Sequence, residues 1–195
     1  MRRVQPDDLD RDTWFLLHEV RLRGVFDAEE ATIVETLIEA DLVVRTPRGI
    51  RITPTGREVH EEWARVVPGS EVEATVLRAY KRFLVLNPEL LRLCTEWQVR
   101  PGGSANDHRD HEYDWAILDR LSSVDDRVGP LVSSVARVID RFDGYRSRLR
   151  AARSQIEAGA PDWFTSPRTD SYHTVWMQLH EDLLLALGKD RASER

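Results

Sequence analysis

Apolar side chains recur at about the helical period in two segments near the start of the chain, residues 9–24 and 27–41. In the first segment Asp10 or Asp12 is placed to cap the helix, and in the second Asp27 precedes the apolar face in the same way. The pattern therefore predicts two amphipathic helices.

Two short β-branched runs follow within residues 42–53, on either side of a turn that contains Pro47 and Gly49. Proline fixes its own φ angle and glycine accepts a positive one, so this arrangement predicts a β-hairpin. A third helix is expected over residues 58–66. Pro68, Gly69 and Ser70 then form the clearest boundary in the sequence.

Beyond this boundary the apolar pattern returns to the helical period and predicts four or five helices. We expect them over residues 71–99, as one long helix or as a pair broken at Asn87-Pro88 with Asn87 as the second cap, over 111–121, over 126–158 with an interruption near 143–144, and from Ser171, capped by Asp170, to Leu187. Helices of this number and length are typical of an antiparallel bundle.

The order of helix, helix, hairpin and helix comes with two short sequence features. Ala40-Asp41-Leu42-Val43 leads into a basic hairpin, and Ile52-Thr53-Pro54-Thr55-Gly56-Arg57 follows it. Over residues 10–67 the chain thereby resembles the winged helix-turn-helix modules of bacterial transcriptional regulators such as the MarR and PadR families. The resemblance implies a DNA-binding regulator in which the hairpin is the wing.

We therefore expect a mainly α protein with two domains. Residues 1–67 would form an N-terminal winged helix with a short β-hairpin, and residues 71–195 an antiparallel helical bundle. The pattern of the families places two helices between the first helix and the wing, whereas here only residues 25–41 are available for them. The helix-turn-helix is accordingly expected to be abbreviated.

Charge divides the expected winged helix into an acidic helix and a basic hairpin. The segment 27–41, which corresponds to the recognition helix, carries six carboxylates and neither Lys nor Arg, so it would repel the DNA backbone. Residues 42–57 carry no acid and supply the candidate DNA contacts Arg45, Arg48, Arg51 and Arg57. The alternative is a solvated hairpin whose arginines pair with the neighbouring acidic helix.

Histidines, charged residues and tryptophans gather in the polar stretch 106–114 and around the last predicted helix. Aromatic walls with a few convergent polar groups are the usual form of a small-molecule site. The residues expected to bind such a ligand are Arg100, His108, His111, Trp115, Arg168, His173, Trp176 and His180. The alternative is that the tryptophans fill a helical core.

Catalytic and metal signatures are weaker than this aromatic signal. His173 and His180 are seven residues apart, which is about 10.5 Å along a helix and too far for one ion, so neither a metal nor a cofactor is expected. A helical enzyme centred on His108, His111, His173 and His180 is the least favoured alternative. Cys94 lies in an apolar run and is expected to be a buried small side chain.

The composition of the chain indicates in which compartment it works and which partners it binds. No run approaches the roughly 20 apolar residues of a membrane-spanning helix, and no signal peptide can be recognised, so a cytoplasmic protein without membrane contact is expected. The net charge of −6 disfavours indiscriminate binding to nucleic acid. A homodimeric regulator that binds DNA and a small molecule is the leading hypothesis. The main alternative is an accessory subunit whose winged helix contacts a protein partner instead of DNA.

Overall fold

The computed structural model describes residues 9–26 and 31–190, and these residues form two compact units. The first consists of the described residues of Met1–Pro68 and Leu184–Arg195, and the second is Gly69–Leu183. Within the first unit the backbone N–H of Val66 donates to the carbonyl of Ala186 at 2.9 Å. The last turn of the final helix and residues 188–190 therefore belong with the N-terminal part of the chain, whereas the sequence placed them in the bundle.

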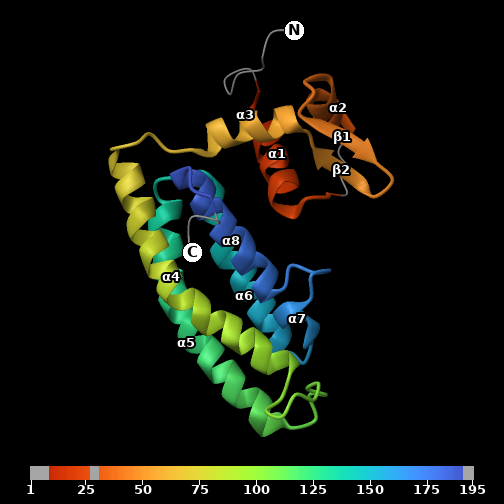
Figure 1. Ribbon diagram of the computed structural model, residues 1–195, viewed down its shortest axis with the longest axis vertical. Helices are drawn as coiled ribbons and strands as arrows, with labels where there is room; N and C mark the ends of the chain where they lie inside the picture. The colour runs from red at the N-terminus through yellow and green to blue at the C-terminus, as the bar shows by residue number, and fades with distance from the viewer. Residues whose placement is uncertain (1–8, 27–30, 191–195) are drawn as a thin grey trace. The chain divides into compact units, whose positions relative to one another are not determined.

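The first unit contains three helices and a hairpin among its described residues (Figure 1). They are α1 (Arg11–Arg23), α2 (Ala31–Glu39), β1 (Val43–Thr46), β2 (Gly49–Ile52) and α3 (Pro54–Ala64). The Asp10 side chain caps α1 by accepting a hydrogen bond from the backbone N–H of Thr13 at 2.8 Å. The cap expected at Asp27 and the carboxylates of Glu29 and Glu30 lie outside the described residues.

The predicted antiparallel hairpin is confirmed, with Val43 opposite Ile52 and Thr46 opposite Gly49. Gly49 has a φ of 119°, which explains the need for glycine at the end of the turn. Phe26 forms an isolated bridge with Ile50, and their two backbone hydrogen bonds measure 3.1 and 2.8 Å. A third short piece of extended chain thus lies beside β2.

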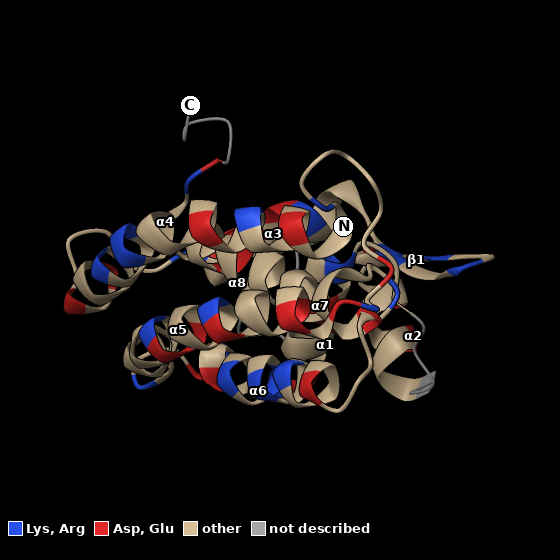
Figure 2. Cartoon of the chain, turned by 90° about the horizontal axis from the view of Figure 1, so that it is seen from below, with Lys and Arg blue, Asp and Glu red and all other residues tan. Residues whose placement is uncertain are grey.

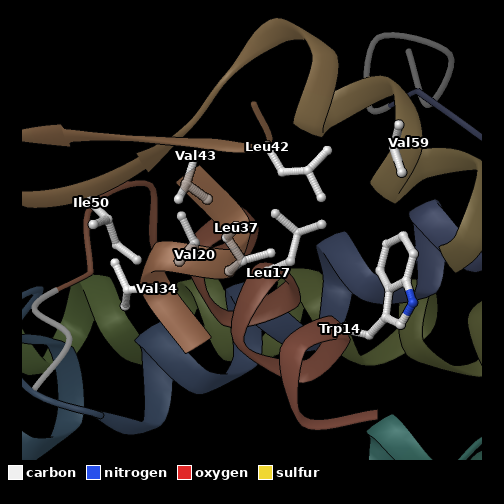
Figure 3. Close-up of a cluster of buried hydrophobic side chains, with 9 residues drawn as sticks. All are labelled: Trp14, Leu17, Val20, Val34, Leu37, Leu42, Val43, Ile50 and Val59. Carbon is white, nitrogen blue, oxygen red and sulfur yellow. The ribbon is translucent and has the colours of Figure 1, made fainter. Parts of the chain in front are cut away.

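One hydrophobic core holds the hairpin against the three helices of this unit (Figure 3). It is formed by Trp14, Leu17 and Val20 of α1, Val34 and Leu37 of α2, Leu42, Val43 and Ile50 of the hairpin region, and Val59 of α3. All nine side chains are buried. Because both strands contribute to this core, the hairpin has a fixed place in the unit.

Helix α3 begins four residues earlier than the start predicted at Glu58. Thr53 is its N-cap and accepts a hydrogen bond from the backbone N–H of Gly56 at 2.9 Å, while Pro54 occupies the first turn. Gly56 packs so closely on the chain that a Cβ atom there would lie 2.0 Å from the carbonyl oxygen of Leu42. The Thr-Pro-x-Gly sequence is therefore the start of the helix, and glycine is required by the close approach.

The second unit is helical, which confirms the prediction of a mainly α chain (Figure 1). Its elements are α4 (Glu71–Gln98), α5 (His111–Ala136), the 3-10 turn η2 (Asp140–Phe142), α6 (Asp143–Glu157), the short α7 (Asp162–Thr165) and α8 (Tyr172–Leu187), whose last turn belongs to the first unit. Helix α5 packs along α4 and also against α6. Within the described part of the chain, no helix has both the length and the apolar character that crossing a membrane requires.

The structure has one long helix α4 instead of the pair broken at Asn87-Pro88, and the break predicted after residue 121 is wrong. Helix α4 continues through Pro88, and α5 continues through residues 121–126 and past Pro130. Both prolines are exposed, so each ring lies on the solvent side of its helix. Asn87 was expected to cap a new helix, but its side-chain oxygen accepts a hydrogen bond from the indole N–H of Trp176 at 2.9 Å.

The remaining boundaries differ less. The helical stretch predicted over residues 126–158 is interrupted at residues 137–142. The interruption was expected at 143–144, but α6 already begins at Asp143. The residue expected to cap the last helix, Asp170, instead accepts a hydrogen bond from Arg148 at 3.0 Å. The backbone N–H of Thr174 is bound by the hydroxyl of Ser171 at 3.2 Å, so the serine takes the capping role.

An aromatic cluster fills the interior of the second unit. We call it the Trp176 cluster, and it comprises Tyr80, Phe83, Tyr172, Trp176 and His180. The ring of Phe83 lies 4.7 Å from that of Trp176 and 4.8 Å from that of His180. All five side chains are buried.

Candidate ligand-binding site

A hollow of about 280 Å³ lies where the end of α4, the start of α5 and the turn after α6 meet. We call it the aromatic pocket. Its apolar lining includes Trp97, Trp115, Leu118 and Ile156, and its polar lining includes His108, His111, Asp114 and Glu157. The volume suits a compound of about one ring, at the lower end of the range for small-molecule sites.

The loop between α4 and α5 closes on itself and so positions this pocket. Val99 pairs with Ala105 in an isolated bridge, and the backbone N–H of Asn106 donates to the carbonyl of Gln98 at 2.9 Å. The side chain of Asp110 then caps α5 by accepting from the backbone N–H of Tyr113 at 3.1 Å. Because both ends of the loop are fixed, the side chains it carries have defined positions.

His108 is held in this loop by a carboxylate and an indole ring. Its Nδ1 lies 3.0 Å from Oδ2 of Asp114, and its ring lies 4.5 Å from that of Trp97. Asn106 completes the arrangement by donating to Oδ1 of Asp114 at 2.8 Å and to the carbonyl of Trp97 at 3.1 Å. His108 has a φ of +57°, an uncommon value for a residue with a side chain.

The contact with Asp114 sets the chemistry of the imidazole. A carboxylate can only accept hydrogen bonds, so Nδ1 of His108 carries the hydrogen, and Nε2 of the neutral ring is an acceptor. The side chain of His108 is 26% exposed, which leaves part of the ring open to solvent. The site can therefore offer a hydrogen-bond acceptor of fixed orientation to a ligand.

Arg100 braces the loop and does not line the pocket. Its guanidinium donates to Asp110 at 2.6 Å and lies 4.4 Å from the ring centre of Tyr113. The hydrogen bond from Arg100 lowers the pKa of Asp110, and the same bond raises the pKa of Arg100. Both charges are thus stabilised within the loop.

The other expected ligand residues lie in two kinds of surroundings. Trp176 and His180 belong to the buried Trp176 cluster, as in the alternative in which aromatic residues fill a core. His173 is half-buried on α8, where burial lowers its pKa, and Arg168 is exposed after α7. The structure therefore brings His108, His111 and Trp115 to one pocket and leaves the remaining five out of its lining.

Trp97 and Asp114 line the pocket but were not selected from the sequence. A signal for Asp114 existed, because it lies four residues after the capping Asp110 and so on the same side of the first turn of α5. Trp97 counted among the aromatic residues near the polar stretch, but an aromatic residue in an apolar run is equally consistent with a core position, so it was not chosen as a ligand residue.

The polar side chains of the pocket lining are histidines and carboxylates. Its described lining contains no hydroxyl, thiol or amine side chain. Over the described residues there is also no group of three or more His, Cys, Asp or Glu that could hold a metal ion. Cys94 is buried, and burial raises the pKa of its thiol to about 12.

The hairpin that contains β1 carries basic residues, drawn blue in Figure 2, and its arginines differ in their partners. Arg45 lies opposite the buried Ile50 in the hairpin and forms an ion pair with Glu35 of α2. Arg51 lies opposite Val44, and both are exposed. Among the described residues no ion pair involves Arg51, Arg48 at the turn, or Arg57 on α3, and all three are exposed.

No protein-family model matches the chain, and no curated protein or solved structure shows significant similarity to it.

Proposed function

We propose that this protein is a winged-helix transcriptional regulator whose helical unit senses a small aromatic molecule. The observation that carries the proposal is the aromatic pocket, in which Asp114 holds His108 by one ring nitrogen beside Trp97. Trp115 supports it, because its side chain lines the same pocket and is 63% exposed. A large exposed aromatic side chain next to an oriented polar group is a common feature of ligand sites.

The residues that line the aromatic pocket indicate which class of ligand it would bind. Two indole rings favour a flat aromatic compound, and Nε2 of His108 favours a group that donates a hydrogen bond. The proposed ligand is therefore a phenol, whose ring packs against Trp97 and Trp115 and whose hydroxyl donates to His108.

Calorimetric titration with a simple phenol and with its methyl ether tests this assignment. The two compounds have similar rings, but only the phenol can donate a hydrogen bond, so the wild-type protein should bind it more tightly. His108→Ala should weaken phenol binding about 2- to 12-fold, the equivalent of one hydrogen bond of about 0.5–1.5 kcal/mol, and should leave ether binding nearly unchanged.

The control for this titration is His173→Gln, which changes a histidine of the same unit outside the pocket lining. It should bind both compounds as the wild type does. Equal affinity of the wild type for phenol and ether, or no effect of His108→Ala, would remove the pocket as a phenol site.

The hairpin supplies the DNA contact in this proposal. Arg48 and Arg51 are exposed and form no ion pair with a described residue, so their charges can neutralise phosphates. Arg57 follows on α3 and adds a third such charge. Arg45 contributes less, because Glu35 already neutralises it. A regulator of this kind works in the cytoplasm, where bacterial DNA lies.

Fluorescence anisotropy with a labelled duplex at several salt concentrations tests the DNA contact. The double variant Arg48→Glu, Arg51→Glu should bind every duplex more weakly, and the slope of log affinity against log salt should become shallower by about 1 to 2. Arg150→Glu is the matched control, because Arg150 is an exposed arginine of α6. A wild-type protein that binds no duplex at low salt would exclude DNA binding.

A second candidate function is an accessory subunit whose winged helix binds a protein. The ion pair between Arg45 and Glu35 favours it, as does α2, whose described residues carry carboxylates but no Lys or Arg. Val44, half exposed on the hairpin, would add apolar contact area. Phenol binding in the absence of duplex binding would support this candidate over the DNA-binding one.

A homodimer completes the proposal. Leu84, Val85 and Leu91 are exposed apolar residues on one stretch of α4, and Val85 is 74% exposed. Such a stretch is suited to a two-fold interface between two copies of the chain. Sedimentation of the wild type as a dimer and of Val85→Glu as a monomer is the expected result.

A further inference from the structure

A second hollow, of about 590 Å³, lies between the first half of α4 and the end of α5. We call it the basic groove. Three of its cations, Arg78, Lys81 and Arg82, come from α4, and the fourth is Arg137, directly after α5. The three positions on α4 follow the i, i+3, i+4 spacing that places side chains on one helix face. Four positive charges therefore surround one hollow.

The cations of the basic groove differ in their partners from most of the other arginines of this unit. Elsewhere in the unit, ion pairs join Arg120 to Glu96, Arg127 to Glu89, Arg141 to Asp182, Arg148 to Asp170 and Arg153 to Glu157. The groove has no acidic residue in its described lining, and none of its four cations forms an ion pair with a described residue. The one hydrogen bond made by these side chains within the described chain runs from Arg78 to the hydroxyl of Thr75.

This concentration of charge occurs in a chain whose net charge is −6. Four cations around one hollow repel one another, and a bound anion would relieve that repulsion. Because most other arginines of this unit pair with carboxylates, the lack of a carboxylate in the described lining leaves the groove complementary to an external anion.

The rest of the lining indicates which other chemical groups an anionic ligand would have. Ala79 and Leu131 form a buried apolar floor, and Val138 is a half-exposed apolar side chain beside it. The hydroxyls of Thr75 and Ser134 add polar contacts. A ligand for this groove thus combines several negative charges with an apolar or aromatic part, and the volume lies within the range for small-molecule sites.

We propose that the basic groove binds a nucleoside polyphosphate. Its phosphates would contact Arg78, Arg82 and Arg137, since guanidinium groups bind phosphate oxygens in pairs. Its base would lie on the apolar floor at Leu131 and Val138. The groove shares no lining residue with the aromatic pocket, so this inference does not depend on the function proposed above.

Calorimetric titration of the full chain at constant ionic strength tests the proposal with three probes. They are adenosine triphosphate, inorganic triphosphate and adenosine. Adenosine triphosphate should bind, inorganic triphosphate should bind at least about 3-fold more weakly because it lacks the base, and adenosine should show no measurable binding. A nucleotide that binds no better than inorganic triphosphate would overturn the nucleotide assignment.

Variants locate the site. The double variant Arg82→Gln, Arg137→Gln should weaken nucleotide binding about 10-fold or more, because two charged hydrogen-bonding groups are lost. Arg92→Gln with Arg150→Gln removes the same charge from exposed positions outside the groove, and it should leave binding nearly unchanged. Equal losses in the two double variants would show a general charge effect and overturn the proposal.

Two further measurements keep the result unambiguous. The groove variants should melt within a few degrees of the wild type, since all four cations are exposed. If the double variant Arg82→Gln, Arg137→Gln does not fold, the single variant Arg78→Gln provides the same test. Single-stranded RNA that binds more tightly than adenosine triphosphate and displaces it would assign the groove to nucleic acid and contradict the nucleotide proposal.

Discussion

The Trp176 cluster and the aromatic pocket are built from the same kinds of residue but differ in what their polar atoms contact. Each contains tryptophan and histidine side chains, which come from α8 in the cluster and from α4, α5 and the loop between them in the pocket. In the cluster the rings are buried, and the indole N–H of Trp176 donates to Asn87. In the pocket the ring of His108 is anchored at Nδ1 and partly exposed, and Trp115 is mostly exposed.

The difference shows why residue type alone does not identify a ligand site. A buried histidine packed on aromatic rings contributes to the core, whatever its chemical capacity. A histidine that a carboxylate holds at one nitrogen, with the rest of its ring open, has a fixed direction in which to bind. The comparison predicts that changes in the cluster act mainly on stability, and that changes in the pocket act mainly on binding.

Trp176→Ala should have the largest effect on stability. The side chain is fully buried against Phe83, so its removal leaves a cavity and should lower the free energy of unfolding by about 3–5 kcal/mol. Urea unfolding followed by circular dichroism measures the change. Trp176→Phe keeps most of the packing and should lose clearly less. A loss below about 1 kcal/mol for the alanine variant would contradict the assignment of this cluster to the core.

Asp114→Ala should rank second and should affect both properties. The carboxylate is buried and accepts from Asn106 at 2.8 Å, so its loss leaves a buried amide without this partner and should cost about 1–3 kcal/mol. It also releases His108, so phenol binding should weaken. The exposed Asp119 on the same helix provides the control, since Asp119→Ala should change neither quantity. Unfolding in urea and calorimetry give the two readouts.

His173 should produce a smaller effect that depends on pH. Burial lowers its pKa below the ordinary value of 6.5, so the unfolded chain takes up a proton before the folded chain does as the pH falls. The neutral ring therefore favours the folded state above this ordinary pKa, and that advantage is lost at lower pH. Wild-type stability should fall more steeply between about pH 7.5 and 5 than that of His173→Gln. Parallel curves would show that His173 does not contribute.

Local signals in the sequence were sufficient for much of the fold. The β-branched runs around Pro47 and Gly49 predicted the hairpin, and the apolar periods predicted a mainly α chain. Pro88 was misleading, because it lies on an exposed face of a helix that continues through it. The side on which a proline lies depends on the packing of the helix, which a local pattern does not contain.

The candidate site was only partly predictable for a similar reason. His108, His111 and Trp115 lie close together in sequence and meet in the pocket. Trp176 and His180 share their chemistry, but α8 places them in the interior of the unit. The contact of His108 with Asp114 joins residues only six positions apart in the sequence. The burial of Trp176 instead depends on its packing against Phe83, which lies far from it in the sequence.

Trp115→Ala should have the smallest effect on stability and is the most direct test of the comparison. The side chain is 63% exposed, so its removal leaves no buried cavity and should change the free energy of unfolding by no more than about 0.5 kcal/mol. Phenol binding should nevertheless weaken, because one of the two indole walls is lost. Trp115 is therefore expected to contribute mainly to ligand binding, and Trp176 mainly to stability. A destabilisation by Trp115→Ala as large as that by Trp176→Ala would mean that both rings are structural, and the distinction between pocket and core would fail.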